Sequence, residues 1–167
     1  TGYQDLMLDY KDSNKWTDYT WEVKGKLLGG RVWGVCFRYV DTSTNYRLNL
    51  YEDLDGVNNL YIYKRVNGTF SEVQKVPVGK IDKDVWYTLK LEIKGNAMKA
   101  YLDNALKIET DDKNAPIDAG TIALQGETNT LFQVETVNIE GKGIPTAAAV
   151  EPAGKLATAW GTIKATR

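Results

Sequence analysis

The sequence contains no histidine and a single cysteine, and both features limit the chemistry that the chain can perform. Without histidine, the chain lacks the commonest general base and the commonest transition-metal ligand. Ser-His-Asp catalysis, Cys-His catalysis and zinc sites built on histidine are therefore excluded. The lone thiol, Cys36, cannot form an internal disulfide, and its place inside an apolar segment predicts a small buried side chain.

Strong charge and long apolar runs are also missing. The 167 residues carry a formal net charge of −1, which disfavours nucleic acid and charged membrane surfaces as partners. No apolar run approaches the ~20 residues that a helix needs to span a bilayer. The length fits one domain with a sizeable core.

What the sequence does contain is a series of short alternating runs rich in Val, Ile, Leu, Tyr and Trp, separated by Gly, Asn and Asp turns. The predicted strands are 19–27, 32–40, 45–52, 59–66, 70–76, 85–93, 97–103, 105–110, 120–126 and 131–139. Short antiparallel strands at this spacing predict an all-β sandwich or barrel.

The character of the sequence changes near residue 140. We predict a β-sandwich domain over 1–140, a Gly/Pro/Ala linker over 141–154 and a strand-like tail over 155–167. The tail brings back bulky apolar residues, namely Leu156, Trp160 and Ile163.

The segment 37–51, FRYVDTSTNYRLNLY, has two alternating runs around a turn at 41–45. Successive side chains of a strand point to opposite faces, so one face is apolar and the other carries arginine, asparagine and tyrosine. If strands 32–40, 45–52 and 59–66 are neighbours, the second face comprises Arg38, Arg47, Asn49, Tyr51, Tyr61, Tyr63 and Arg65.

Two interpretations fit this face. Aromatic rings suit the apolar C–H faces of sugars, and arginine and asparagine side chains suit their hydroxyl groups, which favours glycan binding. Alternatively, it is a solvated or interface-forming face on which Tyr–Arg pairs across strands stabilise the sheet.

The motifs WTDYT, GGRVWGVCFRYVD, NYRLNL, VNGTF, WYTLKLEIKGNAMKAYLD, GTIALQ and VETVNI, in this order, resemble the concanavalin A-like lectin/glucanase superfamily. The likeness covers about residues 16–140 and is strongest to the laminin-G-like branch, which includes fructan-binding modules and the domain of 3-keto-glycoside hydrolase proteins. It implies a two-sheet antiparallel jelly-roll sandwich that binds ligands on its concave sheet. The same fold serves lectins, glycan-binding modules, glycosidases and spacer domains.

The resemblance and the polar-aromatic face together favour a non-catalytic, extracellular or cell-surface domain that binds carbohydrate. The Glu-x-Asp-x-x-Glu signature of the superfamily's glucanases is absent, so a glycoside-processing enzyme ranks third. The second hypothesis is a structural subunit whose tail strand inserts into a neighbouring copy and builds a filament or array. Docking of the tail on its own domain is the alternative use of that segment.

Calcium is the one metal whose oxygen ligands the chain offers. The candidate ligands are Asp53, Asp55, Asp111, Asp112 and Glu135. The segment 53–59 resembles the start of a calcium loop, but Val57 and Lys64 occupy positions that need oxygen ligands, and an Asp-Gly hairpin explains it as well. The loop 111–118 is an alternative, and the superfamily resemblance adds Glu135.

Overall fold

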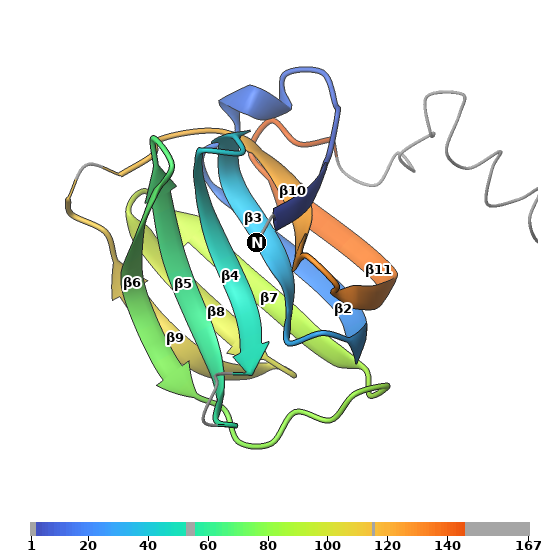
Figure 1. Ribbon diagram of the computed structural model, residues 1–167. Helices are drawn as coiled ribbons and strands as arrows, with labels where there is room; N and C mark the ends of the chain where they lie inside the picture. Colours follow the sequence, from blue (N-terminus) through green and yellow to red (C-terminus); the bar gives the residue numbers. More distant parts are fainter. Residues whose placement is uncertain (1–2, 53–55, 115, 146–167) are drawn as a thin grey trace, which may run out of the picture.

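The computed structural model describes residues 3–52, 56–114 and 116–145, which form two antiparallel sheets packed face to face (Figure 1). The six-stranded sheet has, in spatial order, β1 (Tyr3–Met7), β10 (Thr121–Glu127), β3 (Val32–Asp41), β4 (Thr44–Glu52), β5 (Asn58–Val66) and β6 (Thr69–Pro77). The five-stranded sheet has β11 (Leu131–Gly141), β2 (Tyr19–Gly29), β7 (Tyr87–Lys94), β8 (Ala97–Leu102) and β9 (Ala105–Asp111).

All ten predicted strands are confirmed, and the structure adds one more, β1. Its sequence, YQDLM, does not alternate, and Leu6 and Met7 are both exposed, so no periodicity marked it as a strand. The strand pairs antiparallel with β10 at the edge of the six-stranded sheet (dark blue in Figure 1). This unpredicted strand matters for the site described below.

The core lies between the sheets and uses the apolar half of the alternating pattern. Trp21 and Leu91 from the five-stranded sheet meet Trp33, Leu48 and Ile62 from the other, and all five are at most 2% exposed. Burying side chains of this size stabilises the fold by about 1.5–3 kcal/mol each. Trp21 and Trp33 are therefore core residues.

Ile144, in the stretch predicted as linker, is also buried in the core, so packing continues past residue 140. Trp86 precedes β7 and is exposed. Over the described ranges, the single helix is the three-residue 3-10 turn Ser13–Lys15, and no helix there is long and apolar enough to cross a membrane.

A buried carboxylate ties the two sheets together at one end of the sandwich. Asp112 follows β9, and its side chain accepts hydrogen bonds from Tyr46 Oη (2.7 Å) and Lys64 Nζ (2.5 Å) of the six-stranded sheet. Burial alone would raise the pKa of this carboxyl, but the hydrogen bonds from Lys64, Tyr46 and the Asn114 N–H outweigh it and hold the pKa below its usual value.

We predict that Asp112→Asn lowers the free energy of unfolding at neutral pH by about 1–3 kcal/mol, because Lys64 loses its buried charged partner. A carboxyl with a lowered pKa stabilises the fold above its unfolded-state pKa of about 4, and this contribution is lost as pH falls through the folded-state value. The difference in unfolding free energy between wild type and variant should therefore become smaller as the pH falls. Urea unfolding at several pH values measures it.

The matched control is Asp111→Asn, whose carboxylate is half exposed and lies 3.5 Å from Lys113 Nζ. It should change the unfolding free energy by less than about 0.5 kcal/mol. Equal losses in the two variants would show that the Asp112 contacts do not join the sheets in solution.

Candidate functional site

The polar-aromatic residues lie in successive cross-strand rows on the outer face of the six-stranded sheet. In one row Arg47 lies between Cys36 and Tyr63, and in the next Asn49 lies between Gly34 and Tyr61. Residues directly opposite one another on antiparallel strands point to the same side. Six of the seven predicted side chains therefore share one face, namely Arg47, Asn49, Tyr51, Tyr61, Tyr63 and Arg65.

The prediction that Arg38 belongs to this face is wrong. A register shift lies between the pairs Phe37–Tyr46 and Asp41–Thr44, and Arg38 itself has a φ of 43°. Such a bulge breaks the two-residue period, so the parity of the sequence no longer gives the direction of the side chain. The buried guanidinium instead donates to three carbonyl oxygens, those of Thr17, Gly95 and Ile117. Arg38 is thus a structural residue at the end of the sandwich.

The face is hollowed into a cavity of about 230 Å³. Its lining residues are Arg47, Asn49, Tyr51, Tyr63, Phe70 and Glu127. A cavity of about 150 Å³ accommodates a benzene ring, so this one has room for a single sugar ring with its hydroxyl groups.

Sequence reasoning missed two of the lining residues. Phe70 lies opposite Arg65 across the hairpin formed by β5 and β6, and the Asn67-Gly68 turn could have placed it there. Glu127 comes from β10, and no local signal indicates that β10 pairs with β3.

Stacked and edge-on aromatic rings form one wall of the cavity. Tyr61 and Tyr63 stack with ring centroids 4.7 Å apart, and Phe70 meets Tyr63 edge-on at 6.3 Å. The Arg47 guanidinium lies over the Phe70 ring with its Cζ 5.2 Å from the centroid. These contacts fix the rings at low entropic cost and leave Tyr63 and Phe70 facing the cavity.

The floor of the site contains buried amide groups. Asn49 and Gln125 are 4% and 0% exposed and flank Gly34, which is paired with both. Within the part of the chain that the structure describes, Asn49 Oδ1 and both amide atoms of Gln125 have no hydrogen-bond partner. A Cβ at position 34 would come within 2.2 Å of the Leu48 carbonyl oxygen and 2.6 Å of Asn49 Oδ1, so only glycine fits between the strands here.

Leaving such groups without a partner costs about 1–3 kcal/mol each. A ligand hydroxyl that bonded to them would recover this free energy. The floor is therefore suited to a polar ligand.

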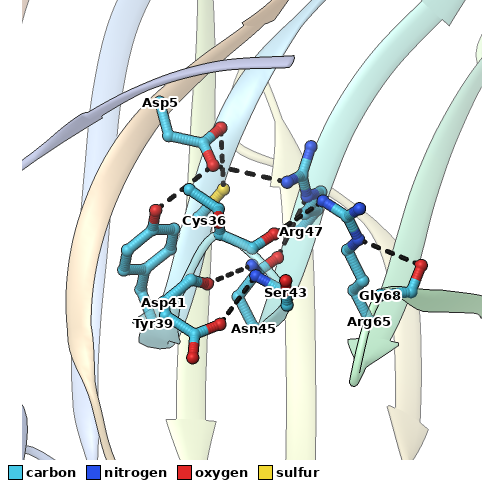
Figure 2. A network of polar contacts seen from close by, with 10 residues as sticks. Asp5, Cys36, Tyr39, Asp41, Ser43, Asn45, Arg47, Arg65 and Gly68 are labelled. Atoms are coloured by element: carbon cyan, nitrogen blue, oxygen red, sulfur yellow. Dashed lines mark hydrogen bonds and ion pairs between the residues drawn. The ribbon is translucent and has the colours of Figure 1, made fainter. Parts of the chain in front are cut away.

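At the remaining corner of the site, Arg47 forms an ion pair with Asp5 of β1 (Figure 2). Arg47 Nη2 lies 3.4 Å from Asp5 Oδ2, and the side chains are 1% and 3% exposed. Arg47 Nε also donates to Asn45 Oδ1 at 3.0 Å. On its other side Asp5 lies 3.4 Å from Tyr39 Oη and 3.9 Å from Cys36 Sγ.

Two neighbouring groups in this corner have perturbed pKa values. Burial, reinforced by the charge of Asp5, raises the pKa of Tyr39 to about 12. Burial also raises the pKa of the Cys36 thiol, and the positive charge of Arg47 only partly offsets it. Cys36 is 0% exposed, so the prediction of a small buried side chain is confirmed.

The three candidate calcium ligands that the structure describes, Asp111, Asp112 and Glu135, do not form a common site. Asp112 binds Lys64, Asp111 lies near Lys113, and Glu135 forms an ion pair with Lys24. Asp111 ends β9 and Glu135 lies in β11, at opposite edges of the five-stranded sheet. Asp53 and Asp55 lie outside the described residues. Within those residues, no three His, Cys, Asp or Glu side chains gather in a way that could hold a metal ion.

The predicted contact residues of the tail, Leu156, Trp160 and Ile163, also lie outside the described residues. Their insertion into a neighbouring copy stays a prediction.

No protein-family model and no curated protein matches the sequence. Among solved structures, carbohydrate-binding module CBM66 from Bacillus subtilis aligns with a TM-score of 0.68 and 23% identity, covering 84% of this chain and 96% of that module. The chain has the concanavalin A-like jelly-roll fold. A toad ovary galectin in complex with thio-digalactose shares this fold (TM-score 0.62, 14% identity, 84% of this chain and 99% of that one). CG-16, a homodimeric agglutinin from chicken liver, also shares it (TM-score 0.58, 15% identity, 83% of this chain and 100% of that one).

We predict that a thiol reagent such as DTNB labels Cys36 in the native protein at least about 100-fold more slowly than in the unfolded chain. Labelling requires local opening, because Sγ lies beneath Asp5 of β1 and the thiol is protonated. Asp5→Ala should accelerate labelling, whereas Leu6→Ala, at the exposed neighbouring position, should not. Rapid labelling of the native wild type would show that β1 does not cover this corner.

Proposed function

We propose that this chain is a non-catalytic carbohydrate-binding domain that acts outside the cell or at its surface, and that the cavity on the six-stranded sheet holds the sugar. The observation that carries the proposal is a cavity lined both by the packed rings of Tyr63 and Phe70 and by Asn49, whose buried Oδ1 has no hydrogen-bond partner among the described residues.

The chemistry of a sugar ring matches both parts of this cavity. The C–H face of the ring is apolar and packs on aromatic planes such as Tyr63 and Phe70. The hydroxyl groups both donate and accept hydrogen bonds, as do the amide groups of Asn49 and Gln125. Because β10, β3, β4, β5 and β6 pair in succession in one sheet, these groups are held in place before the ligand arrives, which reduces the entropic cost of binding.

The composition of the cavity favours binding over hydrolysis. Glycoside hydrolysis ordinarily uses two carboxyl groups, one on each side of the scissile bond. Among the described residues that line the cavity, Glu127 alone carries a carboxylate, and nearby Asp5 is engaged by Arg47.

The comparisons add independent support, although identities below 25% establish the fold alone. One structural neighbour is named as a carbohydrate-binding module, and another was solved with thio-digalactose bound. The alignment covers more than nine-tenths of each of these two proteins, so the likeness extends over their whole domain.

A glycan array followed by calorimetry on the best ligand tests the proposal. Tyr63→Ala and Phe70→Ala should each weaken binding by about tenfold or more, since each removes an aromatic surface from the cavity wall. The matched control is Tyr101→Ala, an aromatic residue on the outer face of the five-stranded sheet that contacts Glu92 and Lys90.

The control should bind like the wild type, and thermal unfolding should show that all three variants are folded. Binding that is unaffected by Tyr63→Ala and Phe70→Ala would place the sugar elsewhere. Absence of any bound glycan on a broad array would refute the function itself.

A further inference from the structure

Building on the carbohydrate-binding function, we propose that β1 forms part of the sugar site. Its Asp5 positions Arg47 and offsets the charge of that arginine, so that the cavity selects an uncharged sugar over the corresponding uronic acid. Asp5 is thus a specificity-determining residue contributed by a strand that lies outside the region of sequence resemblance.

The first step is the position of Asp5 within the sheet. Asp5 pairs with Gln125, which pairs with Gly34, which in turn pairs with Asn49. The residue is therefore at the end of the cross-strand row that forms the amide floor of the cavity. Its side chain turns toward the next row and meets Arg47, as Figure 2 shows.

The second step is the restraint on Arg47. Arginine has a long side chain with several rotatable bonds. Two acceptors restrict its conformation here: Asn45 Oδ1 accepts from Nε, and Asp5 Oδ2 accepts from Nη2. Asn45 Nδ2 in turn donates a hydrogen bond to the backbone carbonyl oxygen of Asp41 at 2.8 Å. This arrangement holds the guanidinium over the Phe70 ring at the cavity wall, where it can meet a sugar hydroxyl in a defined direction.

The third step is the charge of the cavity. A buried arginine by itself would attract a carboxylate strongly, because the surroundings screen the charge poorly. Here Asp5 lies against Arg47, and Glu127 adds a second negative charge to the lining. Among the described residues, the Arg47 guanidinium and the carboxylates of Asp5 and Glu127 together leave no excess positive charge for a uronate to neutralise, and the Glu127 carboxylate repels it.

Three other cations lie around the face, and their positions distinguish them from Arg47. Arg31, Arg65 and Lys75 lie over the rings of Tyr51, Phe70 and Tyr61 at 4.7–5.1 Å from the centroids. None of the three is among the described residues that line the cavity. Their attraction for an anion passes through solvent and is screened by salt, whereas the effect of the buried Asp5 carboxylate is screened much less.

The test uses matched neutral and acidic sugars as probes: glucose with glucuronic acid, and galactose with galacturonic acid, each displayed on the same carrier. We expect the wild-type chain to bind the preferred neutral sugar at least about tenfold more tightly than its uronic acid, at both low and physiological salt. In Asp5→Asn the preference should fall to within about threefold or reverse, because Arg47 loses the negative charge of the Asp5 carboxylate.

Two further variants separate charge from structure. Asp9→Asn removes an exposed acid soon after β1 and makes the same change in net charge, so it should keep the wild-type preference. Glu127→Gln leaves the Asp5–Arg47 pair intact and should reduce the preference without loss of fold, which provides a test even if Asp5→Asn is unstable. Asp5→Glu should restore part of the selectivity. If Asp5 had only a structural role, Asp5→Asn would weaken the binding of both sugars of a pair equally.

The outcomes distinguish this inference from the function on which it rests. If wild type binds no sugar on the array, the proposed function fails. If it binds a uronic acid as tightly as the neutral sugar, or if the ratio is unchanged in both Asp5→Asn and Glu127→Gln, the function survives and the selectivity proposal is wrong.

Discussion

The structure depends on one constraint: β4 is buried on both of its faces. Toward the core it presents Tyr46, Leu48 and Leu50, and on the outer side it presents Asn45, Arg47 and Asn49, all of them at most 4% exposed. Strands buried on both sides are usually apolar on both sides. Here the outer residues are polar, and buried polar groups need hydrogen-bond partners.

This need organises the surroundings of β4. Arg47 is satisfied in part by Asp5 and Asn45, and the aromatic rings of Tyr63 and Phe70 close over its apolar surface. Asn49 Oδ1 and both amide atoms of Gln125 remain without hydrogen-bond partners within the described chain. The polar face is thus a network that the protein completes at one side and leaves incomplete at the other. The incomplete side coincides with the cavity, and for this reason we place the ligand there.

The sequence predicted this arrangement only where the backbone kept a strict two-residue period. Arg47, Asn49, Tyr51, Tyr61 and Tyr63 alternate without interruption along β4 and β5, and parity alone assigned them to one face. Arg38 has the right parity but lies within a bulge, so its side chain binds backbone carbonyls at the end of the sandwich instead. Bulges arise from pairing with the neighbouring strand, and a single sequence carries little information about that pairing.

The sequence by itself determined the ten alternating strands, the separation of apolar from polar-aromatic side chains and the burial of Cys36, because strand periodicity is a local property of the chain. Only the tertiary structure decided which strands became neighbours. It brought Asp5 from the N-terminal strand to Arg47, carried Glu127 from β10 into the cavity and placed the buried side chains of Asn49 and Gln125 on either side of Gly34. Asp5 lies 42 positions before Arg47 in the sequence, and Glu127 lies 80 positions after it. Their meeting at one site depends on sheet order and register, which result from packing of the whole domain.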